Sequence, residues 1–207
     1  MTPERISDLV GADVSRETID RLEVYRLALL KWSKSINLVS RASLDAAQFR
    51  HFDDSLQVLA AAPEAETWVD LGSGGGFPGL VVGIVAAEIR PHTRMTLIES
   101  DQRKAEFLRH VSRETKVDVR VLSQRIEEAP PQHVQIVSAR ALADLDTLLG
   151  YAVRHLADSG TCLFLKGARA TAEIIDSQKR WSYDVEQIPS RTDPEGVLLK
   201  IEGVQRV

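Results

Sequence analysis

Five glycines fall within residues 72–79, directly after an apolar run that contains the carboxylate of Asp70. The whole segment, residues 67–79, reads TWVDLGSGGGFPG. Glycine has no Cβ and tolerates positive φ, so such a loop can bring its backbone against a ligand. Pro78 suits the first turn of a helix, where its missing N–H would have no partner. We predict a strand, a loop and a helix start that form a nucleotide-type cofactor site at the carboxyl edge of a parallel sheet.

Two cofactor classes fit this loop. Gly74, Gly76 and Gly79 satisfy the dinucleotide pattern G-x-G-x-x-G, which is a weak signal alone. Asp70, Gly72, Gly74 and Gly76 also match the D-x-G-x-G-x-G loop with which class I methyltransferases bind S-adenosyl-L-methionine. A carboxylate before the loop would repel a pyrophosphate but attract a sulfonium and an ammonium. The loop therefore favours S-adenosyl-L-methionine.

A second acid ends the next apolar run. Residues 95–99 read MTLIE, and Glu99 lies 29 residues beyond Asp70. A carboxylate at this strand tip can accept hydrogen bonds from both ribose hydroxyls of a bound nucleoside. This spacing fits both cofactor classes, and a surface acid after a strand is the simpler alternative.

Composition bounds the class of protein. The chain has 207 residues, of which 43% are hydrophobic and 27% charged, as in a globular protein with one well-buried core. No apolar run approaches the roughly 18 residues that a membrane span needs. The first ten residues carry Glu4, Arg5 and Asp8 and lack the apolar part of a signal peptide. Cys162, the one cysteine, makes neither an internal disulfide nor a cysteine zinc site. We expect a cytoplasmic protein with no membrane partner and no metal.

The net charge of −4 is unevenly distributed. Residues 26–50 carry five Lys/Arg against one acid, and residues 101–125 carry seven against four. Such patches can bind the phosphates of RNA while the whole chain avoids indiscriminate binding. Solvated helix faces are the alternative interpretation.

The first 62 residues have a helical pattern. Ser15 can cap a helix whose apolar positions recur at three or four residues: Ile19, Leu22, Tyr25, Leu29 and Trp32. A further helix is predicted from Phe49, Phe52, Leu56 and Leu59, ending before Pro63. We expect residues 1–62 to form a helical extension packed on the core, within one compact domain.

From residue 63 onward strands and helices alternate. Strands are predicted at 67–71, 94–99, 117–122, 134–139 and 160–165, and helices at 78–89, 101–114 and 142–157. This alternation predicts a parallel, doubly wound, Rossmann-like α/β sheet. A helix near 170–180 and strands at 182–188 and 196–202 follow, with the turn-rich residues 191–196 between the strands. A terminal antiparallel hairpin favours the class I methyltransferase fold for residues 63–207.

Further motifs recur along the chain in a fixed order. They are KWSKSINLVS at 31–40, RHFDDS at 50–55, RIEE at 125–128, SARA at 138–141 and FLKG at 164–167. In this order and spacing the chain resembles the bacterial glucose-inhibited division protein B family, from about residue 15 to the end. The resemblance implies methylation of guanine N7 in the decoding-region loop of 16S rRNA, at guanine 527 in the family.

Cofactor contacts carry over from the family to five positions. They are Gly72, Phe77, Ile126, Glu127 and Arg140. Ile126 and Glu127 follow the third strand, where a backbone amide and a carboxylate can bind the adenine edge, or where they simply form a loop ion pair. The loop departs from the family at Gly75, where relatives often have Pro or Ala.

Two basic residues end strands at the predicted catalytic edge. Arg140 follows the fourth strand, where its guanidinium can hold the cofactor carboxylate or an RNA phosphate in a bidentate fork. Lys166 ends the fifth strand and points toward the same edge. For both, the alternative is a structural surface role, and we expect a solvent-exposed Arg140 whose truncation costs little stability.

RNA contacts are predicted at Lys31, Lys34, Arg50, His51 and Asp54. His51 and Asp54 are three residues apart on a helix and so share one side. That side faces the substrate cleft or carries an exposed ion pair.

Guanine N7 has an in-plane lone pair and no proton, so transfer needs positioning rather than a general base. Consistent with this, SAR at 138–140 replaces the Asp/Asn-Pro-Pro-aromatic motif of amino methyltransferases. Trp32 and Phe77 are candidates to stack on a splayed base. The partner is 16S rRNA, alone or in the small ribosomal subunit; no DNA partner is expected, and the protein is expected to be a monomer. A small-molecule methyltransferase and a silent cofactor- and RNA-binding module are the alternatives.

Overall fold

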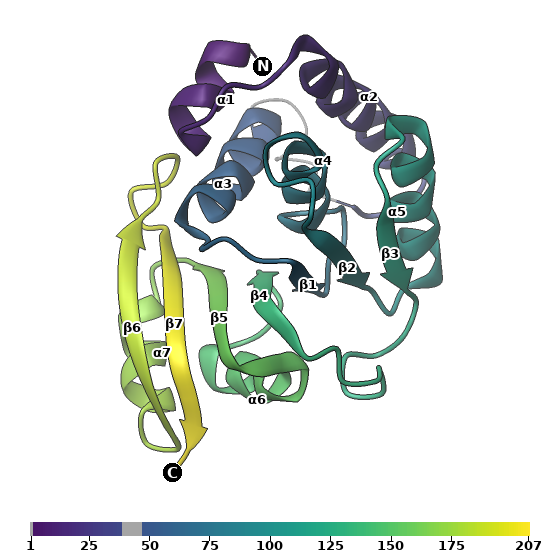
Figure 1. The fold of residues 1–207 in the computed structure, drawn as a ribbon. Helices are drawn as coiled ribbons and strands as arrows, with labels where there is room; N and C mark the ends of the chain where they lie inside the picture. Colours follow the sequence, from purple (N-terminus) through teal and green to yellow (C-terminus); the bar gives the residue numbers. More distant parts are fainter. Residues whose placement is uncertain (1, 39–46) are drawn as a thin grey trace.

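A seven-stranded sheet organises the computed structural model, which describes residues 2–38 and 47–207 (Figure 1). The strand order is β3-β2-β1-β4-β5-β7-β6. Strands β1 to β5 are parallel, whereas β7 is antiparallel to both β5 and β6. The bounds are β1 (Thr67–Leu71), β2 (Arg94–Ile98), β3 (Val119–Leu122), β4 (Val134–Arg140), β5 (Leu156–Lys166), β6 (Trp181–Pro189) and β7 (Val197–Arg206). The predicted doubly wound sheet with a terminal hairpin is confirmed.

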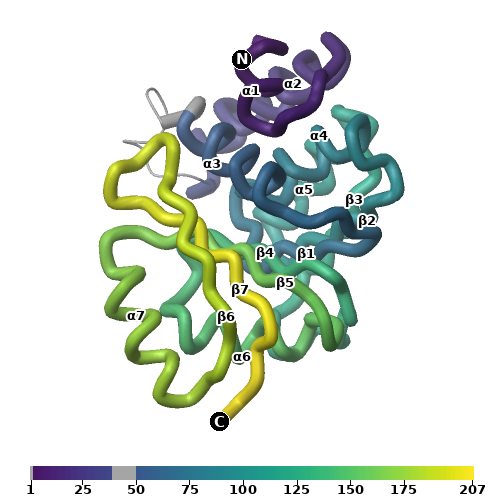
Figure 2. The backbone as a smooth tube through the Cα atoms, turned by 60° about the vertical axis from the view of Figure 1, so that its left-hand side comes forward, coloured from purple at the N-terminus to yellow at the C-terminus, as the bar shows by residue number. Residues whose placement is uncertain are grey.

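Helices cover both faces of this sheet. They are α1 (Pro3–Val10), α2 (Arg16–Trp32), α3 (Ala47–Ala61), α4 (Gly79–Ile89), α5 (Gln102–Thr115), α6 (Leu145–His155) and α7 (Ala170–Ser177). Helices α1 to α5 contribute to one hydrophobic cluster and α6 and α7 to another. Figure 2 shows α1 and α2 at one end of the molecule and α6 and α7 at the other. Among the described residues, no helix combines the length and apolar character needed to cross a bilayer.

The helical extension packs on the glycine loop. Ser15 caps α2 as predicted, its hydroxyl accepting from the amide of Thr18 at 3.3 Å. Tyr25 in α2 is fully buried, and its hydroxyl donates to the carbonyl of Gly75. The expected break before Pro63 is confirmed, since α3 ends at Ala61. Val39 and Ser40, which end the first family motif, and the side chain of Phe49 lie outside the described residues.

Two of the boundaries that differ from the sequence prediction are explained by local geometry. The helix expected from residue 142 begins at Leu145, because the carboxylate of Asp144 accepts from the amide of Thr147 at 2.9 Å and so caps it there. Pro78 precedes α4 as its N-cap residue instead of lying in the first turn. The second shift, of one residue, is within the range over which helix ends are commonly assigned.

Candidate functional site

The loop between β1 and α4 has a backbone that requires glycine. The φ angles of Gly72, Gly74 and Gly76 are +62°, +53° and +96°. L-residues with a Cβ rarely adopt these values, whereas glycine adopts them freely. The loop therefore keeps its shape only while these three positions carry glycine.

The surroundings of the loop differ from one glycine to the next. A Cβ at Gly72 would lie 2.6 Å from Leu142, and one at Gly76 would lie 2.7 Å from the hydroxyl of Tyr25. At Gly74 the nearest atom would be 3.8 Å away, an ordinary van der Waals distance, so this part of the loop is uncrowded.

Gly75, where the family often has Pro or Ala, lies close to the helical extension. A Cβ at this position would be 3.0 Å from the carbonyl oxygen of Leu38. Glycine at position 75 therefore fits the close approach between the loop backbone and the backbone of Leu38.

Asp70 lies beneath the loop. Its carboxylate is fully buried, and Oδ1 accepts from the hydroxyl of Ser138 at 2.7 Å. The indole N–H of Trp68 donates to the same hydroxyl at 2.9 Å. A Cβ at Gly79 would lie 2.7 Å from Oδ2 of Asp70, so α4 begins directly over this carboxylate. The carboxylate predicted to attract a cationic cofactor is thus enclosed by Ser138 and the start of α4.

Glu99 connects the loop to the next helix. Its Oε2 accepts from the amide of Gly74 and its Oε1 accepts from the amide of Asp101, both at 2.8 Å. Asp101 in turn caps α5. The carboxylate is therefore at the predicted strand tip, beside the uncrowded part of the loop.

Residues 126–129 are held by α6. Nε2 of His155 lies 3.0 Å from the carbonyl oxygen of Ile126, and the hydroxyl of Tyr151 donates to Glu127 at 3.1 Å. Arg154 donates twice to the carbonyl of Ala129, at 3.1 and 2.9 Å. Burial lowers the pKa of His155, so a neutral imidazole donates through Nε2. Sequence reasoning missed these contacts, although positions 151, 154 and 155 share one side of a helix.

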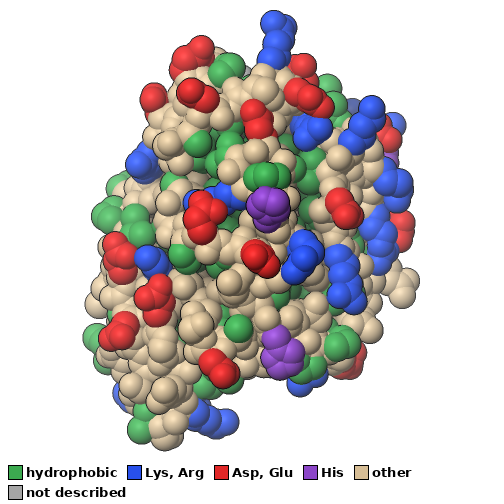
Figure 3. Space-filling model, in the orientation of Figure 1, with side chains coloured by type: hydrophobic (Ala, Val, Ile, Leu, Met, Phe, Trp, Pro, Cys, Tyr) green, Lys and Arg blue, Asp and Glu red, His purple; other side chains and the backbone are tan. Residues whose placement is uncertain are grey.

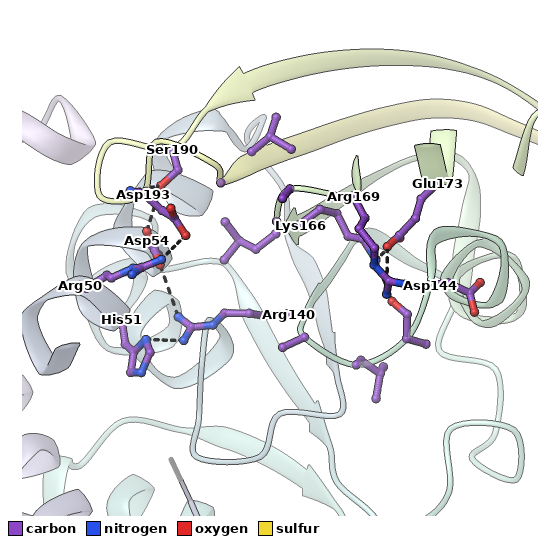
Figure 4. A pocket seen from close by; sticks show the side chains of 18 residues that line it. Arg50, His51, Asp54, Arg140, Asp144, Lys166, Arg169, Glu173, Ser190 and Asp193 are labelled. Carbon is purple, nitrogen blue, oxygen red and sulfur yellow. Dashed lines mark hydrogen bonds and ion pairs between the residues drawn. The ribbon is translucent and has the colours of Figure 1, made fainter. Parts of the chain in front are cut away.

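A cavity of about 670 Å³ opens at the carboxyl ends of β4 and β5 (Figure 4). One end carries Arg50, His51, Asp54, Ser190 and Asp193, and the other carries Asp144, Lys166, Arg169 and Glu173. Leu142, Leu165 and Val197 supply apolar lining. Its size and its mixed lining are typical of a small-molecule or nucleotide site.

Arg140 lies between the glycine loop and this cavity. Its guanidinium lies over the ring of Phe77, 5.5 Å from the centroid, and its Nη2 contacts Nδ1 of His51. Nη1 lies 3.7 Å from Oδ2 of Asp54 and is buried without a hydrogen-bond partner. Only 19% of the side chain is exposed, so the expectation of an exposed arginine is wrong. Burial lowers the pKa of Arg140, but an arginine keeps its charge at neutral pH.

His51 is a neutral partner for this cation. Burial and the charges of Arg140 and Arg50 lower the pKa of His51 to about 4. Its ring lies 5.2 Å from that of Phe77. The predicted shared side of His51 and Asp54 therefore faces the cavity, and neither residue belongs to an exposed pair.

The remaining predicted residues are divided between the cavity wall and the surface. Lys166 lines the cavity, where its ammonium donates to the carbonyl of Ala143 at 2.7 Å and pairs with Glu173 at 2.5 Å. Lys31 and Lys34 are exposed beyond the cavity, at the end of α2. Trp32 packs on α5, with ring centroids 5.7 Å from Phe107, so it is part of the helix packing.

Basic side chains gather along α5 and β3, as Figure 3 shows on the right of the molecule. This surface corresponds to the basic segment 101–125 of the sequence. It lies on the side of the sheet away from the cavity, since β3 is at the far edge from β5.

Comparisons with known proteins agree with this geometry. The family model GidB, described as rRNA small subunit methyltransferase G, matches residues 18–195. A protein of that name from Ruegeria sp. (strain TM1040) is 55% identical over 94% of this chain and 95% of the relative. A protein of the same name from Ruegeria pomeroyi is 49% identical over 98% of this chain and 99% of the relative.

Solved structures show the same fold. The N-methyltransferase NodS from Bradyrhizobium japonicum WM9, in complex with S-adenosyl-l-homocysteine, matches with a TM-score of 0.54 and 15% identity. The match covers 88% of this chain and 97% of NodS. The class I methyltransferase fold predicted from the sequence is therefore confirmed.

The buried carboxylate of Asp70 predicts a pH dependence of stability. Burial raises its pKa from 3.8 to about 6, so the folded state binds this proton more tightly than the unfolded state. Raising the pH from about 4 to about 6 should then lower the free energy of unfolding by up to about 3 kcal/mol through this group. Urea unfolding of Asp70→Asn across this range should lack that decrease. Parallel curves for the parent and the variant would show that the pKa of Asp70 is not raised.

Proposed function

Because the chain belongs to the family of rRNA small subunit methyltransferase G, we propose that it methylates N7 of one guanine in 16S rRNA. The resemblance to the glucose-inhibited division protein B family is thereby confirmed. The target nucleotide would be guanine 527 of the decoding-region loop. One observation carries the proposal: Arg140 joins a glycine loop for a cofactor to a cavity of nucleotide size.

The cofactor is S-adenosyl-L-methionine, which supplies an electrophilic methyl group on a sulfonium. The uncrowded part of the loop at Gly74 fits a bound nucleoside, and Glu99 lies beside it to accept from ribose hydroxyls. Ile126 and Glu127, fixed by α6, offer an amide and a carboxylate to the adenine. Gly72, Gly76 and Phe77 complete the loop that faces this ligand.

Catalysis at N7 depends on position because this nitrogen has no proton to lose. The neutral His51 and the buried cation of Arg140 fix the geometry at the border of the two sites. Arg50 at the cavity mouth binds the RNA backbone, and Lys31 and Lys34 contact phosphates farther out. Lys166 acts through its ion pair with Glu173, which shapes the cavity wall.

We infer that the protein works as a monomer in the cytoplasm, on rRNA alone or in the small ribosomal subunit, with no DNA partner.

The methylated nucleotide can be mapped chemically. Methylation at N7 leaves a cationic guanine whose glycosidic bond is easily cleaved, so the site is read as strand scission in 16S rRNA. Cells that contain the protein should show one scission that is absent from cells without it. Identical scission in both would rule out the N7 assignment, and methyl transfer to metabolites but not to RNA would favour a small-molecule methyltransferase.

Gly74→Val should abolish binding of S-adenosyl-L-methionine measured by calorimetry. A β-branched side chain resists a φ of +53° and adds bulk to this uncrowded part of the loop. Gly11→Val is a matched control, because Gly11 has a φ of +71° with open space around it and lies at the C-cap of α1, outside the loop. The control should keep the affinity of the parent. Equal affinities of both variants for S-adenosyl-L-methionine would show that the cofactor does not bind at this loop.

Arg140→Ala should lower the turnover of rRNA by about ten- to hundredfold, the cost of a lost charge-assisted hydrogen bond. Because the side chain is buried, the variant should also lose about 1–3 kcal/mol of stability. Arg140→Lys should recover part of the turnover, since an ammonium lacks the planar fork.

The matched control is Arg90→Ala. The side chain of Arg90 is 14% exposed and donates to the carbonyls of Ala62 and Pro63, away from the site. This variant should lose stability and keep its turnover well below its melting temperature. If Arg140→Ala also kept the parental turnover, Arg140 would have only a structural role.

A further inference from the structure

At one end of the cavity, a buried carboxylate lies beside an unsatisfied donor. Asp54 in α3 is 9% exposed, and its Oδ2 is 3.7 Å from Nη1 of Arg140. Nη1 is buried and has no hydrogen-bond partner among the described residues. Both groups line the same cavity, with the side chains converging from α3 and β4 (Figure 4). A buried donor without a partner costs free energy unless a ligand satisfies it.

The hairpin loop between β6 and β7 fixes the position of this carboxylate. The hydroxyls of Thr192 and Ser190 both donate to Oδ1 of Asp54, Ser190 at 3.4 Å. The Ser190 hydroxyl also accepts from the amides of Thr192 and Asp193, at 3.2 and 3.1 Å. Within residues 2–38 and 47–207, the hydrogen bonds of Asp54 fall on Oδ1, so Oδ2 is left for a ligand.

The two groups match the Watson–Crick edge of guanine. This edge presents two neighbouring donors, N1–H and the N2 amino group, beside the acceptor O6. A carboxylate accepts from the donors and a guanidinium donates to O6. Adenine presents an amino donor at position 6 and an unprotonated acceptor at N1. Its N1 would face the carboxylate with no proton between the two acceptors. Proteins read splayed RNA bases through this edge.

We propose that Asp54 and Arg140 select guanine, Asp54 accepting from N1–H and N2–H and Arg140 donating to O6. Ser190 and Thr192 act as positioning residues that hold Asp54. The apolar side chains of the cavity would enclose the flat base. The inference rests on the proposed function, because it concerns the base that this function methylates. A site with a buried carboxylate rejects a base that leaves it unpaired.

Base substitution in the RNA tests the proposal without changing the protein. Small ribosomal subunits are reconstituted with 16S rRNA that carries guanine, inosine or adenine at the mapped position, and kcat/KM is measured by competition. Inosine lacks the N2 amino group, so the parent should methylate it about tenfold less efficiently than guanine, and adenine more than a hundredfold less. Equal rates on guanine and inosine would overturn the contact between Asp54 and N2.

Asp54→Asn tests the carboxylate itself. An amide can donate to N1 of adenine, and its N–H group is mismatched with a donor of guanine, so the ratio of adenine to guanine methylation should rise at least tenfold. Competition in one tube makes this ratio independent of the folded fraction, and calorimetry with S-adenosyl-L-methionine should give the parental affinity. An unchanged base ratio would overturn the proposal.

Asp53→Asn is the matched control. Asp53 is the neighbouring buried carboxylate of α3, but it pairs with Arg5 and lines no part of this cavity. Its base ratio should equal that of the parent. A parent that fails to methylate guanine at N7 would refute the proposed function, whereas a parent that does so while Asp54→Asn keeps its selectivity would refute only this inference.

Thr192→Val tests the positioning role. Loss of the hydroxyl should reduce the preference for guanine over inosine several-fold, and Thr192→Ser should restore it. A merely structural role would change the melting temperature and leave this preference intact.

Discussion

A loop of glycines has no side chains with which to hold itself, so its shape depends on groups from elsewhere in the chain. The hydroxyl of Tyr25 donates to Gly75, Glu99 accepts from Gly74, and Asp70 lies beneath the start of α4. These contacts come from the helical extension and from two strands. Ordering a flexible backbone costs conformational entropy. Because these contacts already order the loop, less of that entropy is lost when a ligand binds.

The buried guanidinium of Arg140 imposes a second constraint. A cation in this position is costly unless it is paired, and a charged histidine beside it would be repelled. The surroundings of His51 lower its pKa to about 4, which removes that repulsion, and the face of Phe77 offers a favourable contact. One nitrogen of Arg140 is nevertheless left without a partner. The site is therefore arranged around a donor that the protein alone does not satisfy.

The sequence patterns predicted the strands whose limits are set by neighbouring residues in the chain. The run at Thr67–Leu71 is bounded by a proline and a glycine, and the strand occupies the predicted residues. Strand β5 begins at Leu156, four residues earlier than predicted. The turn-like residues 158–160 lie inside it, where the register shifts between the pairs Val134–Leu156 and Ile136–Thr161.

Burial at the site depends on tertiary contacts that no local pattern contains. Arg140 is enclosed by α3, which lies about ninety residues earlier in the chain, so its exposure could not be predicted from its place after a strand. Asp54 was predicted to contact RNA from helical spacing alone. Its orientation depends on Ser190 and Thr192, more than 130 residues away.

The two halves of the site come from different parts of the chain. Strands β1, β2 and β4 and the glycine loop form one half, within a fold that NodS shares at 15% identity. Helix α3 and the β6–β7 loop supply Asp54, Ser190 and Thr192 to the other half. Since a shared fold hosts many activities, selectivity for a substrate must come from particular side chains and not from the fold itself. Arg140 lies where these halves meet, at the end of a core strand, and contacts both α3 and Phe77 of the glycine loop.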